Sequence, residues 1–134
     1  MKPTLVDSSV LLDVATEDSK WFAWSSQELA QRGGEAPLVI NQVIWAEVSI
    51  RFETIEEVDA AFPRDVFERA DLPWDAGFVA GKVFARYLAN RGAARVPLPD
   101  FFIGAHAAVA GLRLLTRDPR RIRSYFPTVE LICP

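Results

Sequence analysis

Short apolar runs alternate with longer amphipathic segments along the chain. The segments predict helices at residues 10–14, about 19–31, 42–52, 54–62, 74–90, 99–111 and 120–125. The apolar runs, which are typical of strands, lie at residues 4–6, 37–40, 66–72, 112–115 and 129–132. Because such alternation is typical of a parallel sheet covered on both faces, we expect an α/β protein. The predicted architecture is a three-layer α/β/α sandwich around a parallel sheet of about five strands.

Cap and turn residues mark where several of these helices begin and end. Ser8 and Ser9 are expected to cap the first helix, and Asn41 the third. Gly33 and Gly34 are expected to close the second helix.

The composition is that of one folded domain. The chain has 134 residues, of which 50% are hydrophobic and 25% charged, and nine Phe and four Trp supply material for a core. This composition excludes an intrinsically disordered protein, and no repeat or long Pro/Gly/Ser stretch divides the sequence. We expect a single domain over residues 1–134.

The sequence predicts a cytoplasmic protein without a membrane segment. Asp7 and Asp13 interrupt the apolar start of the chain, so we expect no signal peptide. The longest run without charge, 101–112, has 12 residues, short of the roughly 20 that span a bilayer. A single cysteine, Cys133, fits a reducing compartment.

Charge is distributed unevenly along the chain. Residues 1–81 carry 6 basic and 15 acidic side chains, whereas residues 82–134 carry 9 basic and 3 acidic ones. Most of the basic side chains in the second part are arginines, whose planar donors suit phosphate. The skew fits a polyanionic partner, although charge alone favours an ordinary solvated helix face.

Three aspartates occupy equivalent places in the predicted fold. Asp7 ends the first strand, Asp100 lies in the first turn of a helix, and Asp118 follows the fourth strand. Any one of them alone is more simply interpreted as a helix cap. Because ligand-binding groups collect beyond the carboxyl ends of parallel strands, three together point to a site.

Glu47 is a carboxylate on an apolar helix face. Its neighbours three or four residues away are Val43, Ile44 and Ile50. A surface ion pair with Arg51 is the simpler interpretation, but it leaves those apolar neighbours unexplained. Since burying an uncompensated carboxylate is costly, we expect a cation beside Glu47.

Four carboxylates without a cysteine or a suitable histidine form an all-oxygen ligand set. Such a set selects Mg²⁺ or Mn²⁺ and suits metal-assisted phosphodiester hydrolysis. His106 is the single histidine. On a helix it points about 120° away from Asp100, so we expect it to be structural.

Four stretches resemble, in order and spacing, the PIN-domain ribonucleases. They are residues 5–13, the helical Glu47, residues 99–107 and residues 115–121. The closing stretch, 125–132, is similar to the ends of VapC-type toxins of bacterial toxin-antitoxin pairs. The resemblance covers nearly the whole chain.

The resemblance implies an endoribonuclease that depends on Mg²⁺, with Mn²⁺ as the other suitable ion. In this family pattern the catalytic acids are Asp7, Glu47, Asp100 and Asp118, with Asp7 and Asp100 as principal metal ligands. Ser8 and Thr116 match supporting positions, and Asp13 is assigned a structural role. For RNA phosphates the candidates are Arg117, Arg120 and Arg121.

The resemblance also implies two protein partners, a cognate antitoxin and a second copy in a homodimer. A set of apolar side chains on residues 21–24 and on the helix after Asn41 could lie partly exposed beneath the antitoxin. The set comprises Trp21, Phe22, Trp24, Trp45, Val48 and Phe52. Burial of all of them in the core is an equally good interpretation.

Two other functions compete with a toxin nuclease. A receiver-like signalling module has a similar size and acidic cluster, but it needs a lysine near a late strand. The three lysines are Lys2, Lys20 and Lys82, and none lies there. A PIN-domain nuclease of RNA processing, without an antitoxin, stays open. The RNA that is cut is not specified by the sequence.

Overall fold

A parallel sheet of five strands forms the centre of the protein. The computed structural model describes residues 1–90, 92–93 and 98–134. The strand order is β3-β2-β1-β4-β5, and all neighbouring strands are parallel. The strands are β1 (Thr4–Val6), β2 (Leu38–Ile40), β3 (Phe67–Arg69), β4 (Arg113–Leu115) and β5 (Leu131–Ile132). The predicted fold class is confirmed, although each strand after β1 is shorter than its apolar run.

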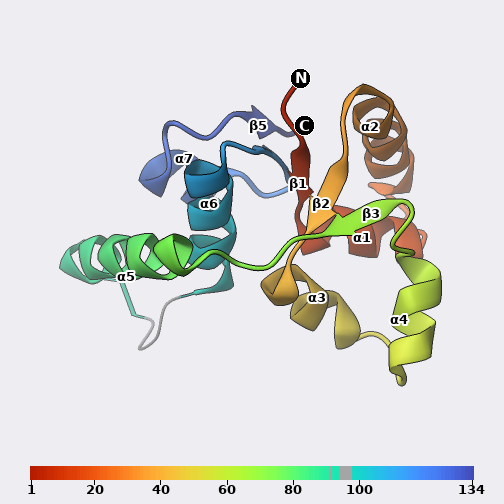
Figure 1. Ribbon diagram of the computed structural model, residues 1–134, viewed down its shortest axis with the longest axis horizontal. Coiled ribbons are helices and arrows are strands. Elements are labelled where there is room, and N and C mark those ends of the chain that lie inside the picture. Colours follow the sequence, from red (N-terminus) through yellow and green to blue (C-terminus); the bar gives the residue numbers. More distant parts are fainter. Residues whose placement is uncertain (91, 94–97) are drawn as a thin grey trace.

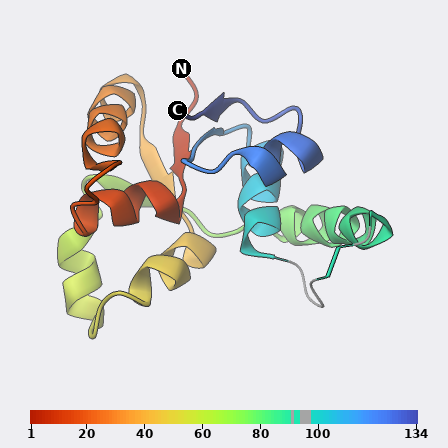
Figure 2. The ribbon, with the colours of Figure 1, turned by 180° about the vertical axis from the view of Figure 1, so that it is seen from behind.

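Helices join the strands and flank the sheet. They are α1 (Ser8–Ala15), α2 (Phe22–Glu35), α3 (Gln42–Ser49), α4 (Ile55–Ala61), α5 (Trp74–Ala89), α6 (Pro99–Ala110) and α7 (Arg120–Tyr125). Figures 1 and 2 show α2 and α4 on one side of the molecule and α5, α6 and α7 on the other. The division follows from the strand order, because the chain moves outward from β1 to β3 and then crosses back to β4.

The middle strand, β1, sets the register of the sheet. Leu5 lies opposite Val39 of β2 and Leu114 of β4, and all three are buried. The backbone N–H of Asp7 continues this pairing by donating to the carbonyl of Leu115 (2.9 Å). The carboxyl ends of β1, β2 and β4 therefore meet at one edge of the sheet, where parallel folds place their sites.

Several predicted helix boundaries are wrong: α2 begins at Phe22 instead of about residue 19, and α3 ends at Ser49 instead of about Phe52. Asp7, and not Ser8 or Ser9, is the N-cap of α1, because its carboxylate accepts the backbone N–H of Ser8. Helix α2 continues through Gly33 and Gly34 to Glu35. Its last turn is held by Arg32, which pairs with Glu28 (3.0 Å) and Glu35 (3.2 Å). Asn41, by contrast, caps α3 as predicted, its side chain accepting the N–H of Ile44 (3.0 Å).

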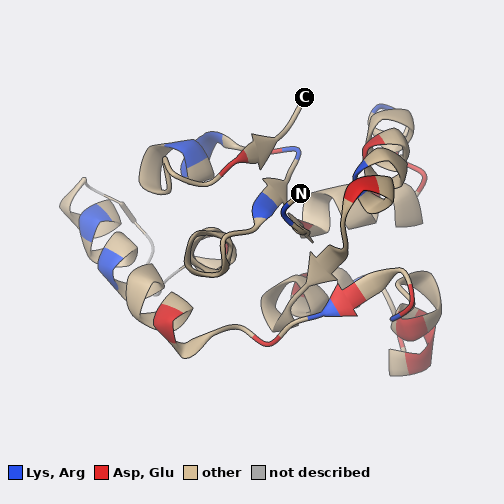
Figure 3. Ribbon diagram, turned by 45° about the horizontal axis from the view of Figure 1, so that its top comes forward, with Lys and Arg blue, Asp and Glu red and all other residues tan. Residues whose placement is uncertain are grey.

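The charge skew appears as separate bands on the fold. Figure 3 shows basic bands on α5 and α7 and acidic bands on α4. Arg91 and Arg95, which contribute to the basic part of the sequence, lie outside the described residues. Among the helices that the structure describes, none combines the length and hydropathy that crossing a bilayer requires.

Candidate active site

Asp7 lies at the carboxyl end of β1, where a network of donors holds its carboxylate. Its Oδ1 accepts the backbone N–H of Ser8 (2.9 Å). Its Oδ2 accepts two hydroxyls, Ser9 Oγ and Thr116 Oγ1, each at 2.8 Å. Thr116 follows β4, so the adjacent strands β1 and β4 together build this position. Thr116, which was expected to support the acids, donates a hydrogen bond directly to Asp7.

Glu47 reaches the same edge from α3. Ser8 Oγ donates to Glu47 Oε1 (3.0 Å), which links the first turn of α1 to the middle of α3. Glu47 is half-buried, while Ile44 and Val48 of the same helix are fully buried. The apolar neighbours Ile44 and Val48 therefore do mark a partly buried carboxylate. Ile50, the third apolar neighbour, is exposed and lies outside the core.

Asp100 and Asp118 border a polar cleft beside this pair. Asp100 is in the first turn of α6, after Pro99 at the first helical position, a favourable place for an acid. Asp118 is exposed, and its backbone N–H donates to Thr116 Oγ1 (3.1 Å). Both acids line the cleft together with Arg120, Arg121 and Ser124 of α7.

Negative charge is crowded at Asp7, Glu47 and Asp100. Burial raises the pKa of Asp7, and the charge of Asp100 raises it further, against the hydroxyl hydrogen bonds that lower it. Burial likewise raises the pKa of Glu47, with Asp7 and Asp100 adding to the shift. In the part of the chain that the structure describes, Asp7 and Glu47 form no ion pair, and Asp100 pairs with Arg121 (3.1 Å).

His106 has the structural place that its helical spacing predicts. The ring is buried, and its Nδ1 lies 2.9 Å from the side-chain nitrogen of Asn41, so the middle of α6 is tied to the N-cap of α3. Burial lowers the pKa of His106, which keeps the ring neutral at pH 7. Because this neutral imidazole is bonded to an amide, the acids are the candidate reactive groups of this edge.

The chain matches the PIN domain model over residues 4–126. It belongs to the PIN domain family. No curated protein sequence matches it. Its fold is similar to solved toxin-antitoxin structures, among them VapBC2 from Rickettsia felis bound to a DNA fragment from its promoter (TM-score 0.74, 12% identity, 98% of each chain covered).

Two further structures extend this likeness. VapBC-1 from nontypeable Haemophilus influenzae superimposes with a TM-score of 0.73 at 13% identity, over 98% of this chain and 97% of that one. A toxin-antitoxin complex from Klebsiella pneumoniae gives 0.67 at 21% identity, over 94% of each chain. At these identities the likeness establishes the fold, and membership of the PIN family rests on the domain match.

The acids of this PIN domain fit a hard divalent cation in their chemistry. PIN-family nucleases use divalent metals, and carboxylates whose pKa values are raised by burial and by neighbouring carboxylates gain from a cation beside them. Across residues 1–90, 92–93 and 98–134, no group of three or more His, Cys, Asp or Glu side chains is arranged to hold a metal ion. One or two carboxylates with water suffice for Mg²⁺, and Asp7 and Asp100 would be the carboxylates to hold it.

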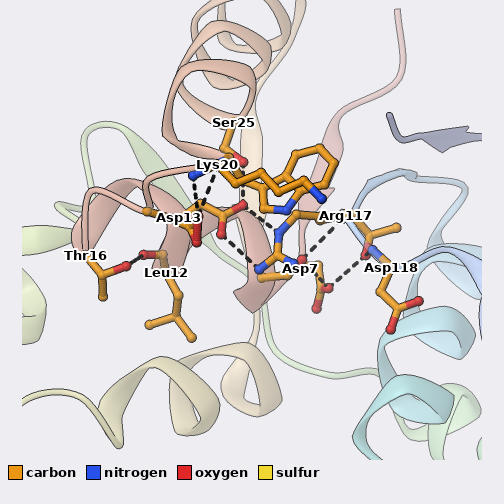
Figure 4. Close-up of polar contacts among 12 residues, drawn as sticks. Asp7, Leu12, Asp13, Thr16, Lys20, Ser25, Arg117 and Asp118 are labelled. Carbon is orange, nitrogen blue, oxygen red and sulfur yellow. Dashed lines mark hydrogen bonds and ion pairs between the residues drawn. The ribbon is translucent and has the colours of Figure 1, made fainter.

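The three arginines that are candidate RNA contacts differ in their ion-pair partners. The Arg120 side chain is 89% exposed, and among the described residues its one ionic contact is a long one to Asp118 (3.4 Å). Arg121 is bonded to Asp100. Arg117 instead turns inward to Asp13, as Figure 4 shows.

Sequence reasoning missed two features of this region. The first is Ser9, whose hydroxyl is bonded to Asp7; its place two residues after the acid was the available signal. The second is the partner of the buried Asp13, which lies 104 residues away at Arg117 and left no local pattern.

Exposed apolar side chains lie mainly outside the predicted partner surface. Of that set, Phe22 is exposed, Val48 is buried, and the four others are half-buried. Helix α5 carries the most exposed large apolar side chain, Trp74 (96%), together with Phe78 (69%). These two lie four residues apart and so share a helix face.

Proposed function

We propose that the chain is a divalent-metal-dependent endoribonuclease and the toxin of a toxin-antitoxin pair. The observation that carries this proposal is the meeting of Asp7, Glu47 and Asp100, three acids distant in sequence, at the carboxyl edge of the sheet. Membership of the PIN family and the fold shared with toxin-antitoxin structures support it.

Each acid would have a separate task in hydrolysis. Bound Mg²⁺ or Mn²⁺ supplies an activated water and neutralises charge on the leaving oxygen. Asp7 and Asp100 would hold the ion, and Asp7 is already oriented by its hydroxyl donors. Glu47, held by Ser8, would orient the attacking water and accept its proton, for which a raised pKa is suited. Asp118 would act as the fourth acid from the rim of the cleft.

RNA would be held by two arginines of α7 that line the cleft, Arg120 and Arg121. Arg120 and Arg121 lie on the same cleft as Asp100, so a phosphate between them would sit beside the acids. Phosphate contacts position a strand without reading its sequence, which fits a substrate of flexible single-stranded RNA. Arg121 must leave Asp100 for this contact, which ties RNA binding to the release of a metal ligand.

An antitoxin and a second copy of the chain are the proposed protein partners. The likeness to toxin-antitoxin complexes supports an antitoxin. Tryptophan fluorescence on addition of an antitoxin tests this partner, because Trp74 is almost fully exposed in the lone chain and its emission would shift if the antitoxin covered it. Sedimentation of the purified chain tests the homodimer. A chain that inhibits growth with no neighbouring antitoxin gene would favour the alternative of an RNA-processing nuclease.

The experiment that tests the activity is a map of RNA 5′ ends after induced expression of the chain and of its Asp100→Asn form. The proposal predicts new ends at discrete sites with the unaltered chain and none with Asp100→Asn. Purified chain should lose cleavage in a chelator. Ends that persist with Asp100→Asn, or cleavage that survives chelation, would contradict the mechanism.

A further inference from the structure

A bidentate ion pair lies behind the candidate active site, between α1 and the segment after β4. Arg117 donates through Nε to Asp13 Oδ2 (2.8 Å) and through its second terminal nitrogen to Oδ1 (2.9 Å). Ser25 Oγ adds a third donor to Asp13 (2.8 Å). The Asp13 side chain is 2% exposed and that of Arg117 is 32% exposed. The guanidinium also lies over the Trp21 ring, 5.6 Å from its centroid.

This pair fixes the backbone that carries the donors to Asp7. The backbone N–H of Arg117 donates to Ser9 Oγ (3.2 Å), and the N–H of Asp118 donates to Thr116 Oγ1 (3.1 Å). The same two hydroxyls contact Asp7 Oδ2. Figure 4 shows Arg117 lying between Asp13 and the Asp7 side of the site.

The direction of these hydrogen bonds follows from the donors. A backbone N–H can only donate, so each hydroxyl oxygen receives one hydrogen bond from the segment 116–118. Each hydroxyl proton is then directed to Asp7 Oδ2, which accepts two hydroxyls. Oδ1 accepts only the N–H of Ser8 among the described residues. One carboxylate oxygen is thereby anchored and the other is left with capacity for a ligand.

We infer that Arg117 and Asp13 are positioning residues for Asp7, and that Arg117 is not an RNA contact. The pair holds the segment 116–118 against α1, and this segment holds both hydroxyls on Asp7 Oδ2. A buried ion pair is often no better for stability than apolar packing, so its presence next to an acid calls for a role beyond stability. This inference rests on the proposed function, since it needs Asp7 to be a metal ligand.

The test compares Mn²⁺ affinity and RNA cleavage in purified Arg117→Gln and unaltered chain. Titration calorimetry without RNA should show Mn²⁺ affinity lowered about tenfold, in the range found when outer-shell partners of metal ligands are removed. Steady-state cleavage of a single-stranded RNA should show a lowered kcat, with KM and its salt dependence unchanged. Arg123→Gln, an exposed arginine of α7 outside the site, is the matched control and should leave all three unchanged.

Ser9→Ala keeps the test decisive if Arg117→Gln does not fold. It leaves the ion pair intact and removes one of the two hydroxyls from Asp7, so a smaller loss of Mn²⁺ affinity and kcat is expected. Unchanged Mn²⁺ affinity in Ser9→Ala would overturn the inference.

The same experiment separates this inference from the proposed function. Arg117→Gln with full Mn²⁺ affinity, raised KM and weaker salt dependence would make Arg117 an RNA contact and overturn the positioning role alone. An unaltered chain that neither binds Mn²⁺ nor cleaves RNA would overturn the proposed function, and the positioning role with it.

Discussion

The two ends of α1 carry two aspartates, of which one is paired with a cation and the other is not. Asp13, near the carboxyl end, is buried against the guanidinium of Arg117 and the hydroxyl of Ser25. Asp7, at the amino end, receives two hydroxyls and a backbone N–H, and no cation among the described residues. Both carboxylates accept three hydrogen bonds, so hydrogen bonding does not distinguish them.

The two aspartates differ in charge compensation, because Asp13 has a cationic partner and Asp7 has acidic neighbours. Asp13 has its counter-charge within the chain, at Arg117, so it is available for holding the segment 116–118 but not for binding a cation from outside. Asp7 is surrounded by further acids, and the burial and charge that raise its pKa leave a place for a cation from outside. The candidate site is therefore marked by a carboxylate, Asp7, that accepts hydrogen bonds but has no cationic partner among the described residues.

The largest expected effect is the loss of cleavage in Asp7→Asn. The amide keeps the oxygen that caps α1 but removes the charge that would hold a metal ion. RNA cleavage in Mg²⁺ should fall below detection, measured by gel assay on a single-stranded RNA. Asp75→Asn, an exposed acid in the first turn of α5, should keep full activity as the control. Activity retained in Asp7→Asn would remove the distinction drawn between the two aspartates.

Asp13→Asn should give the largest loss of stability. Removing one member of a buried ion pair leaves the other uncompensated, at a cost of about 3 kcal/mol in the free energy of unfolding. Urea denaturation of the metal-free chain measures it. Glu35→Gln is the matched control, because it breaks the pair with the buried Arg113 at the other edge of the sheet. The control should also lose stability but keep its Mn²⁺ affinity, whereas Asp13→Asn should lose both.

Asp7→Asn should stabilise the chelated protein by about 1 kcal/mol at pH 7, because it removes a buried charge and relieves the repulsion from Asp100. The gain should shrink as the pH falls. Below its raised pKa the unaltered Asp7 takes up a proton in the folded state, and below its ordinary value of 3.8 it is protonated in both states. Thermal or urea unfolding in chelator at several pH values measures this difference. A gain that grows on acidification would contradict the raised pKa.

The smallest effect is expected from Arg121→Gln. Arg121 pairs with Asp100 at the exposed rim of the site, and such pairs contribute up to about 1 kcal/mol. Since the pair competes with a metal ion for Asp100, Mn²⁺ affinity should rise by about two- to fivefold. Calorimetry checks the affinity, and filter binding should show weaker RNA binding by the same variant. Lowered Mn²⁺ affinity would mean that Arg121 supports the ligands and does not compete with them.

Local patterns predicted the strands and singled out two acids, Asp7 and Glu47, that lie together at the carboxyl edge of the sheet. Apolar runs next to cap residues placed β1 and β2, and the same positions drew attention to Asp7 and Asn41. Glu47 was found because a carboxylate on an apolar helix face is chemically unusual. These signals are contained within a few residues of sequence, so no tertiary information was needed.

Tertiary contacts account for what the sequence did not predict. Gly33 and Gly34 are helix breakers by local preference, but ion pairs of Arg32 and the contact of Glu35 with Arg113 hold the last turn of α2. The inward turn of Arg117 depends on a partner far along the chain, and the exposure of Trp74 depends on which face of α5 meets α6. Only the folded chain decides these.

The most direct test of the central claim is anomalous diffraction from crystals of the chain soaked in Mn²⁺. The account predicts a Mn²⁺ peak bonded to Asp7 and Asp100, near Glu47, with Arg121 released from Asp100 and Arg117 still bonded to Asp13. A crystal that binds Mn²⁺ elsewhere, or leaves the three acids without an ion at saturating Mn²⁺, would contradict it.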